Sequence, residues 1–460
     1  MDCETNKRTI QMVELSINET EKYVLLEQIV TELVKSKKNT WIAGQDWVQY
    51  SGSFMDEKEY IAVIKTLLGG WLALGENGTR FENKFPARLG KEYGCLSNSG
   101  SSANLLMVSA LSSRKLNALP KGSKIITPVA GFPTTINPII QNGFVPVFID
   151  IELDTLNLDI EQLELAAKQG ASALVFAHVL GNPPNMDAVM EIVNRYNLIL
   201  LEDCCDALGS TYKGKPLGSF GSMATCSFYP AHHITMGEGG FIATQTKEQE
   251  MVIKSLREWG RGCYCSGKGA SCLRNGMCKK RFSNWIPALP DEVFDHKYVY
   301  EEIGYNLKPL DLQASMGLVQ LEKLDSIIVK RKHNYKKLFD VFSRYEDKFI
   351  LPTATEGADP AWFAFPITVR SNAGFKRTDL TMFIEDHKIQ TRNYFGGNIL
   401  LQPAYAHLAE GDPVTKYPNA TMATISTFFL GTSPVVTDEH IDYISTVIDK
   451  FFTERVCKKP

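Results

Sequence analysis

Short apolar runs alternate with helix-like segments between residues 95 and 245, and this alternation limits the possible folds more than any other feature. The runs KIITPVA, FVPVFIDI, SALVFAH and NLILLED have the length and composition of strands that are buried on both faces. Between them, DIEQLELAAKQG and NMDAVMEIVNRYN carry apolar residues at helical spacing. The pattern therefore predicts an α/β fold, with a mostly parallel sheet sandwiched by helices.

The remaining segments predict a division of the chain into three parts. Residues 1–70 form an N-terminal helical segment, and residues 71–334 form the large α/β/α domain. Within the large domain, residues 258–300 are rich in cysteines, basic residues and turns, which indicates an insertion with a function of its own. A long helical pattern then leads into a smaller α+β domain at 335–460.

Charge and hydropathy exclude several classes of protein. The net charge of −3 argues against a polyanion binder, because proteins that bind nucleic acid carry a basic excess. No apolar run reaches the roughly 18 residues that a membrane span needs. The N-terminus, MDCETNKRTIQMVELSINETEKY, lacks the apolar core of a signal peptide. We expect a cytoplasmic protein that binds neither nucleic acid nor membranes.

The cysteines are distributed unevenly. Of the ten in the chain, four crowd into the predicted insertion. Disulfides are rare in a reducing compartment, so clustered thiols favour metal ligation or redox work over a disulfide framework. The clustered residues are Cys263, Cys265, Cys272 and Cys278.

Two motifs lie where parallel strands end and helices begin, which is where ligands of such sheets bind. NSGSSANLL (98–106) places small and hydroxyl residues before a helix, and this arrangement suits either an anion site or an ordinary N-cap. LEDCCDALGS (201–210) places Asp203 at the end of a strand. That carboxylate could pair with the ring nitrogen of a pyridine cofactor or cap the next helix.

A third motif, SFYPAHHITMGEGG (227–240), offers His232 and His233 where a cofactor-anchoring loop would carry an amine nucleophile. Together with Phe132, the three motifs resemble those of the pyridoxal-phosphate enzymes of fold type I, and more narrowly the nucleotide-sugar aminotransferases. The resemblance extends from about Trp71 into the C-terminal domain and includes GYNLKPLDLQASMGLVQLEKL (304–324).

This resemblance implies a set of binding residues. Some would hold the cofactor phosphate or cover its ring, one of them from a neighbouring subunit, so a homodimer is implied. His178 resembles part of the family's active-site segment and would help to hold the cofactor, with a structural core histidine as the alternative. Arg392 and Asn398 resemble the family's sugar-nucleotide contacts, with a solvated surface residue as the alternative for Arg392. The remaining implied residues are Gly100, Ser101 and Ser227 at the phosphate, Phe132 over the ring, Asp203 at the ring nitrogen and Asn306 from the neighbouring subunit.

The family's Schiff-base lysine falls on His232. Imidazole, with an unperturbed pKa of roughly 6.5, can move protons but cannot bind the cofactor aldehyde covalently. The amine form, pyridoxamine phosphate, would then be retained without a covalent bond, and with a keto sugar the outcome would be dehydration. The stretch resembles the 4-keto-6-deoxyhexose 3-dehydrases, which begin 3,6-dideoxyhexose synthesis for lipopolysaccharide. His232 would be the base and His233 its neighbour.

One kind of 3-dehydrase also holds a [2Fe-2S] cluster that receives electrons from a flavin or iron–sulfur reductase. The spacing of the cysteines resembles that kind, and thiolates suit iron. Cys272 is an alternative fourth ligand, and a zinc site on the same thiols is an alternative to the cluster. The expected ligands are Cys205, Cys263, Cys265 and Cys278.

The expected activity is removal of the 3-hydroxyl from a nucleotide-linked 4-keto-6-deoxyhexose. The family's commonest substrate is CDP-4-keto-6-deoxy-D-glucose, and dTDP sugars are used by related enzymes. Two alternatives stay open. One is an aminotransferase with a displaced lysine, Lys213 or Lys215, and the other is an inactive, cofactor-binding regulatory protein.

Overall fold

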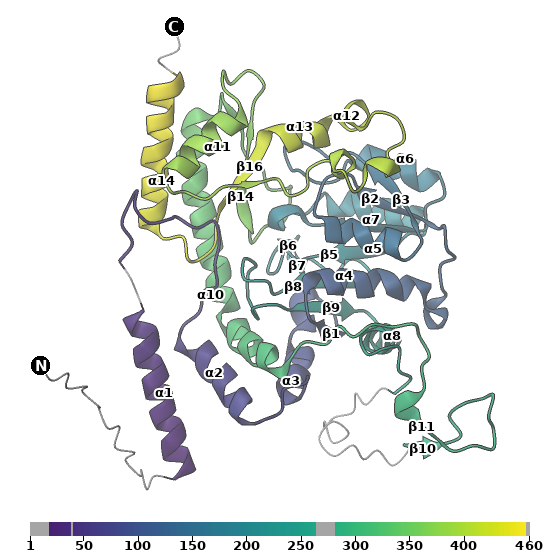
Figure 1. Ribbon diagram of the computed structural model, residues 1–460. Coiled ribbons are helices and arrows are strands. Elements are labelled where there is room, and N and C mark those ends of the chain that lie inside the picture. The colour runs from purple at the N-terminus through teal and green to yellow at the C-terminus, as the bar shows by residue number, and fades with distance from the viewer. Residues whose placement is uncertain (1–17, 38–39, 264–280, 457–460) are drawn as a thin grey trace, which may run out of the picture.

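The computed structural model describes residues 18–37, 40–263 and 281–456, with side chains up to residue 454. Its largest sheet has seven strands in the order β1-β9-β8-β5-β4-β2-β3 (Figure 1). β9 is antiparallel to both of its neighbours, and the other adjacent pairs are parallel. The strands are β1 (Tyr93–Ser97), β2 (Lys124–Pro128), β3 (Val145–Ile149), β4 (Ala173–Ala177), β5 (Ile199–Asp203), β8 (Met223–Ser227) and β9 (Gly240–Thr244).

Helices cover both faces of this sheet, as the alternation in the sequence predicts. Because side chains alternate along a strand, Leu174 of β4 packs into one buried cluster and Val175 into another. One face is covered by α4 (Gly100–Ser109), α5 (Pro133–Gln141) and α8 (Lys247–Arg257). The other is covered by α3 (Glu76–Lys84), α6 (Ile160–Lys168), α7 (Met186–Arg195) and the first half of α10 (Asp311–Phe342).

A smaller unit follows along the chain. Its antiparallel sheet has the order β12-β14-β16-β15, and its core includes Leu338 and Phe342 from the second half of α10. The predicted boundary between 334 and 335 therefore lies inside one continuous helix. The elements are β12 (Phe349–Ile350), β14 (Ala364–Val369), α11 (Arg377–Asp386), β15 (Arg392–Asn393), α12 (Pro413–Lys416), α13 (Pro418–Ser426), β16 (Thr427–Gly431) and α14 (Asp438–Phe451). The smaller α+β domain expected from the sequence is thus present.

A third, three-stranded sheet lies between the two units. It pairs β6 (Thr211–Tyr212) with both β7 (Lys215–Pro216) and β13 (Ala358–Asp359). Two connections therefore join the large and the small unit. One is the continuous helix α10, and the other is the hydrogen-bonded pairing of β13 with β6.

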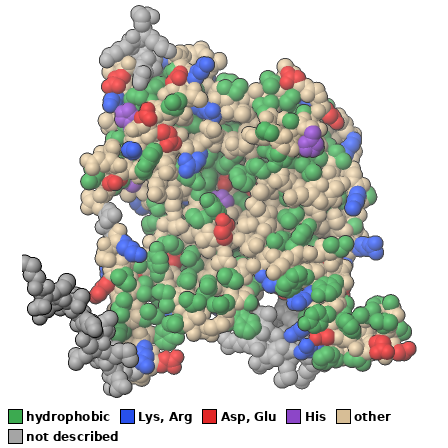
Figure 2. Space-filling view, in the orientation of Figure 1, with side chains coloured by type: hydrophobic (Ala, Val, Ile, Leu, Met, Phe, Trp, Pro, Cys, Tyr) green, Lys and Arg blue, Asp and Glu red, His purple; other side chains and the backbone are tan. Residues whose placement is uncertain are grey.

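The N-terminal segment contributes α1 (Glu19–Ser36) and α2 (Glu57–Leu68), each of which begins with a capping box. α2 packs against α10, while α1 packs against α2 and lies at the edge of the molecule (Figure 1). Apolar side chains gather over this part, at the lower left of Figure 2. Among the described residues, no helix combines the length and hydropathy that crossing a bilayer would take.

The insertion is described on either side of residues 264–280. Its later part forms the small hairpin of β10 (Phe282–Ser283) and β11 (Phe294–Asp295), which projects from the large unit near α8 (Figure 1). The predicted ligands Cys265 and Cys278, and the alternative Cys272, lie outside the described residues.

Candidate active site

A cavity of about 880 Å³ opens at the carboxyl ends of the parallel strands. Its floor comes from the large domain, including Asp203 at the end of β5. Its opposite wall comes from the smaller domain, including Phe363, Arg392 and Phe429, and from Tyr50 of the N-terminal segment. The cavity thus lies between segments that are distant in sequence.

The N-terminus of α4 faces this cavity. Ser99 caps the helix by accepting a hydrogen bond from the Ser102 amide at 3.0 Å, and Gly100 and Ser101 line the cavity beside it. Backbone N–H groups and the helix dipole make this end electropositive. The position can therefore hold a phosphate-sized anion.

Glycines allow the surrounding strands to approach that helix end closely. A Cβ atom at Gly100 would lie 2.4 Å from the Cβ of Ser227, and one at Gly240 would lie 2.2 Å from the Ser99 carbonyl oxygen. Ser227, at the end of β8, lines the cavity next to the helix end. Ser227 and the N-terminus of α4 therefore lie side by side at the cavity.

Asp203 is held by three hydrogen bonds. One carboxylate oxygen accepts from Asn104 Nδ2 at 2.7 Å and from Thr135 Oγ1 at 2.8 Å, and the other accepts from the Cys205 amide at 3.0 Å. Asn104 is itself oriented by Thr225, whose hydroxyl donates to its amide oxygen at 2.6 Å. An ionised carboxylate offers about four acceptor positions, so Asp203 keeps capacity for a donor in the cavity.

Phe132 lines the cavity immediately before α5. Its ring is 51% exposed and meets the Phe395 ring edge-on, with 6.0 Å between the centroids. An exposed aromatic ring on a cavity wall suits stacking against a flat heterocycle.

His232 lines the cavity, and its imidazole lies beside a carboxyl group. Its Nε2 is 3.6 Å from Asp206 Oδ1, and its ring lies edge-on to Phe363 with 5.3 Å between the centroids. Burial, together with the positive charge of Arg331, lowers the pKa of His232 to about 4. Burial and the nearby Asp203 raise the pKa of Asp206 to about 8. The imidazole is therefore neutral at neutral pH and free to accept a proton.

His233, the second histidine of the pair, is buried and does not line the cavity. The Nε2 of His233 lies 2.7 Å from the Ala361 carbonyl oxygen, and its side chain is buried outside the cavity lining. His233 therefore does not face the cavity, whereas His232 does.

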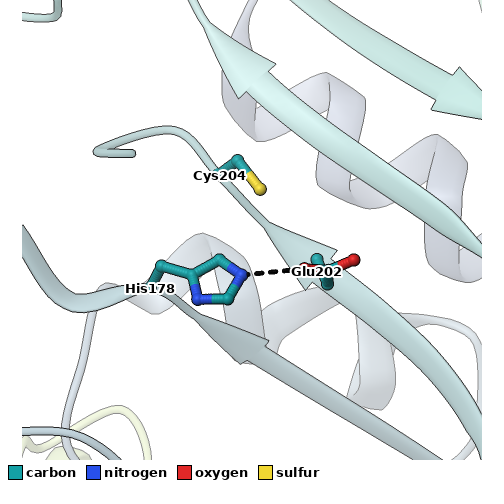
Figure 3. A group of neighbouring side chains, drawn as sticks. All are labelled: His178, Glu202 and Cys204. Atoms are coloured by element: carbon teal, nitrogen blue, oxygen red, sulfur yellow. Dashed lines mark hydrogen bonds and ion pairs between the residues drawn. The ribbon is translucent and has the colours of Figure 1, made fainter. Parts of the chain in front are cut away.

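His178 lies away from the cavity, and the expected cofactor contact is corrected here. Its Nε2 is 2.9 Å from Glu202 Oε2, and both side chains are fully buried (Figure 3). Glu202 precedes Asp203 on β5, so alternation along the strand turns its side chain to the opposite face. It also accepts hydrogen bonds from the amides of Gly218 and Gly221. The alternative of a structural core histidine fits this arrangement.

Cys204 lies close to the same two side chains (Figure 3). Together the three could offer ligand atoms within 4.8 Å of one another. Burial and the charge of Glu202 raise the pKa of the Cys204 thiol well above its usual range. Because the Cys204 thiol stays protonated and the Glu202 carboxylate already accepts hydrogen bonds, these three side chains form a structural cluster in the core. Cys95 and Cys226 are buried as well.

Only Cys205 and Cys263 of the four predicted cluster ligands are described. Cys205 lines the cavity beside Gly100, and Cys263 is half-buried where the insertion leaves the large domain. Burial and the neighbouring Asp203 raise the pKa of the Cys205 thiol well above its usual range. Cys205 is therefore a thiol, not a thiolate, in the protein without metal.

Of the two expected substrate contacts, Arg392 lines the cavity and Asn398 does not. Arg392 lines the cavity with its guanidinium 4.1 Å from the centroid of the Tyr50 ring. Asn398 does not line it, and this expectation is corrected. Its side chain is fully buried, where it donates to the Pro413 carbonyl and to the Thr421 hydroxyl. The side-chain amide of Asn398 thus stabilises the smaller domain by joining two of its segments.

Asn306 is exposed and does not line the cavity of its own chain. Its side-chain oxygen accepts a hydrogen bond from Lys308 Nζ at 2.9 Å. A role in the cavity would therefore require a second chain.

Neither lysine of the alternative mechanism reaches the cavity. Lys213 pairs with Asp187 at the surface, Lys215 is exposed, and the described residues that line the cavity include no lysine.

Several cavity residues were not identified from the sequence. Asn104 and Asp206 lie inside the quoted motifs, Asn104 one helical turn after Gly100, so helical periodicity could have found the first. Thr135 lies shortly after Phe132, and Tyr229 lies inside the third motif, just after Ser227. Arg331 does not line the cavity but donates to the His232 carbonyl oxygen, and nothing in its local pattern marks it.

Known proteins resemble the chain over most of its length. It is 42% identical over 430 residues to the lipopolysaccharide biosynthesis protein RfbH of Salmonella typhimurium, covering 93% of this chain and 96% of the relative. It is 43% identical to the dTDP-4-dehydro-2,6-dideoxy-D-glucose 3-dehydratase of Saccharopolyspora spinosa, covering 90% and 88%. Among solved structures, the E. coli GDP-4-keto-6-deoxy-D-mannose-3-dehydratase with bound hydrated PLP aligns with a TM-score of 0.75 and 29% identity, covering 87% and 99%.

These similarities confirm the fold type I architecture that the motifs resemble. The model of the DegT/DnrJ/EryC1/StrS aminotransferase family matches residues 54–449, and this chain belongs to that family.

Proposed function

We propose that this protein is a 3-dehydratase of nucleotide-linked 4-keto-6-deoxyhexoses that uses pyridoxamine phosphate. The observation that carries the proposal is an imidazole, His232, on the wall of a cavity whose described lining offers no lysine. The relatives that carry 3-dehydratase in their names support the same reaction class.

The donors and acceptors of the cavity fit this cofactor. The N-terminus of α4 and Ser227 suit its phosphate, the spare acceptor of Asp203 suits its ring nitrogen, and Phe132 suits its ring face. When bound, the cofactor supplies an amine that condenses with a ketone and a conjugated ring that takes up electrons.

The side chains then divide the work. With the cofactor bound, Asp203 would keep the ring nitrogen protonated, and Asn104 and Thr135 hold Asp203 in place. His232, neutral because of its burial, would accept a proton from the carbon that bears the amine. An imidazole cannot form the imine by which an amine captures an aldehyde, so the site favours loss of the sugar's 3-hydroxyl over amino transfer.

We further propose CDP-4-keto-6-deoxy-D-glucose as the substrate, in the formation of 3,6-dideoxyhexoses for lipopolysaccharide. Arg392 suits the diphosphate, because its guanidinium is held over Tyr50 at the cavity wall. The similarity to a lipopolysaccharide biosynthesis protein supports this assignment.

A [2Fe-2S] cluster and a reductase complete the proposal. The cluster would be held by Cys205, Cys263, Cys265 and Cys278, and would deliver electrons one at a time from a flavin or iron–sulfur partner. Cys205 supports it because its thiol lies two residues after Asp203 and on the same cavity. We also propose a homodimer, in which the exposed Asn306 reaches the cavity of the neighbouring subunit.

The central test uses the full-length protein under anaerobic conditions. It is incubated with pyridoxamine phosphate, a ferredoxin-type reductase with NADH, and CDP-, dTDP- or GDP-linked 4-keto-6-deoxyhexoses. We expect a product one oxygen atom lighter than the substrate from the CDP sugar. An amino sugar, or a cofactor adduct trapped by borohydride, would instead establish an aminotransferase.

The cluster is tested separately by metal analysis of anaerobically purified protein. We expect iron and acid-labile sulfide in equal amounts, two of each per chain, and their loss in Cys205→Ser. Zinc without sulfide would establish the alternative site on the same thiols. Cys272→Ser and Cys278→Ser, compared directly, identify the fourth ligand.

A further inference from the structure

Arg331 lies on α10 where the large and the smaller domain meet, and its side chain is fully buried. The two ends of its guanidinium point to different segments. Nη2 donates to the carbonyl oxygens of Ala231 at 3.2 Å and His232 at 3.0 Å. Nη1 donates to the Phe363 carbonyl at 2.9 Å and contacts the Thr432 hydroxyl at 3.4 Å.

These partners belong to the loop that carries the base and to the edge of the smaller domain. Phe363 immediately precedes β14, and Thr432 immediately follows β16. The rigid fork of an arginine can hold two such segments at a defined separation, which a single-point ammonium cannot. Arg331 therefore sets the position of the His232 backbone relative to the cavity wall.

The guanidinium is costly to bury. No carboxylate among the described residues lies within ion-pair distance of it, so its charge is balanced mainly by carbonyl dipoles. Burial lowers the pKa of Arg331 to about 9, which still leaves it charged at neutral pH. An apolar side chain could fill the same space without that cost, so the charge calls for a role beyond packing.

We propose that Arg331 is a positioning residue for His232, which it holds against the edges of β14 and β16 through the carbonyl oxygens of both segments. The meaning of this position for catalysis rests on the proposed function, in which His232 is the base. The position itself does not depend on the reaction.

The charge of Arg331 also acts on the imidazole. The titratable or charged groups near His232 are Asp206, Asp203, Arg331, His233 and Tyr229. Burial and Arg331 lower the pKa of His232, whereas Asp203 raises it. Removal of the positive charge should therefore move this pKa upward, and exchange for another cation should not.

The test compares Arg331→Met with Arg331→Lys. Carbethoxylation by diethyl pyrocarbonate requires a neutral imidazole, and mass spectrometry reads it at His232 in the protein without cofactor. In the wild type and in Arg331→Lys we expect the modification rate to stay level down to pH 5.5. In Arg331→Met we expect the rate to begin to fall at a higher pH than in the wild type and in Arg331→Lys, since the repulsion between like charges is gone while the burial of the imidazole remains.

Turnover provides the second readout. We expect both variants to lose about tenfold or more in kcat with little change in KM, because a misplaced base affects the reacting geometry more than substrate binding. Arg370→Met is the matched control. Arg370 also donates to two backbone carbonyl oxygens, those of Glu346 and Phe349, but lies outside the cavity lining.

The proposal is overturned if Arg331→Met folds, melts like the Arg370→Met control and keeps the wild-type kcat and modification profile. If Arg331→Met does not fold, Arg331→Lys decides, and an unchanged kcat overturns the proposal. Absence of dehydration in the wild type would refute the proposed function alone. The modification profile of His232 in the unliganded protein would still test Arg331.

Discussion

Two groups of acids, thiols and histidines lie at the end of β5, one on each face of the sheet. On one face, His178, Glu202 and Cys204 are sealed in the core (Figure 3). On the other, Asp203, Cys205 and His232 line the cavity. The residue types are nearly the same, so composition does not separate a structural cluster from a reactive one.

Spare bonding capacity separates them. Glu202 accepts hydrogen bonds from the His178 ring and from two backbone amides, and it does not line the cavity. Asp203 has three donors but opens onto the cavity, and the Nδ1 of His232 has no hydrogen-bond partner in the described structure. Mutations on the cavity face should accordingly lower kcat with little effect on stability, and mutations on the core face should lower stability with little effect on kcat.

The largest effect on activity is expected from His232→Asn. Asparagine keeps the polarity but cannot accept a proton near neutral pH, so kcat should fall by about 10²–10⁴-fold. The melting temperature should change little, because the imidazole makes no short side-chain hydrogen bond to a described residue and its contacts are a 3.6 Å approach to Asp206 and edge-on packing against Phe363 and Tyr229. Turnover and differential scanning fluorimetry measure the two quantities. Retention of most activity would refute the distinction between the two faces.

Asp203→Asn should have the next largest effect. The amide cannot keep a ring nitrogen protonated, so kcat should fall by about 10–100-fold and binding of pyridoxamine phosphate should weaken. Cofactor fluorescence measures the binding, with Asn104→Ala as a milder variant that only loosens Asp203. Equal cofactor affinity in wild type and Asp203→Asn would contradict this assignment.

Glu202→Gln should lower stability and leave kcat almost unchanged, the reverse of what is expected for His232→Asn. Loss of a buried, hydrogen-bonded charge should cost about 3 kcal/mol in the free energy of unfolding, while kcat per folded molecule stays within twofold of wild type. Urea denaturation measures the cost, and activity is normalised to folded protein. A large loss of kcat in folded Glu202→Gln would place this cluster in the reaction.

The same cluster sets a pH dependence of stability. Burial raises the pKa of Glu202, but the His178 ring and the amides of Gly221 and Gly218 outweigh it and hold the pKa below 4.5. A lowered carboxyl pKa contributes stability above the unfolded value and loses it as the pH falls through the folded value. The stability difference between wild type and Glu202→Gln should therefore be full at pH 6 and shrink below pH 4.5. If the stability difference between wild type and Glu202→Gln instead grows as the pH falls, the pKa of Glu202 is raised by folding rather than lowered.

The smallest effect is expected for Lys213→Met and Lys215→Met. Both lysines lie at the surface, and neither lines the cavity. Turnover should match that of wild type, and borohydride should trap no cofactor on either chain. A loss of activity in one of them would revive the aminotransferase with a displaced lysine.

Much of the large domain could be predicted because strands buried on both faces leave an unmistakable apolar run, as β2 and β4 do. Gly100, Asp203 and Ser227 could be placed at one site because each ends a strand or begins a helix at the same edge of the sheet. Asn398 and His178 could not, since nothing local shows whether the bonds of a polar side chain are already used within the fold.

The sequence by itself determined that position 232 carries an imidazole and that the strands form a mostly parallel sheet, because both follow from residue identity and local periodicity. The tertiary structure alone decided which polar groups meet. Alternation along β5 sends Glu202 and Asp203 to opposite faces, and the crossing of α10 brings Arg331 to the carbonyl of His232. Contacts across such distances depend on packing, and no local pattern encodes them.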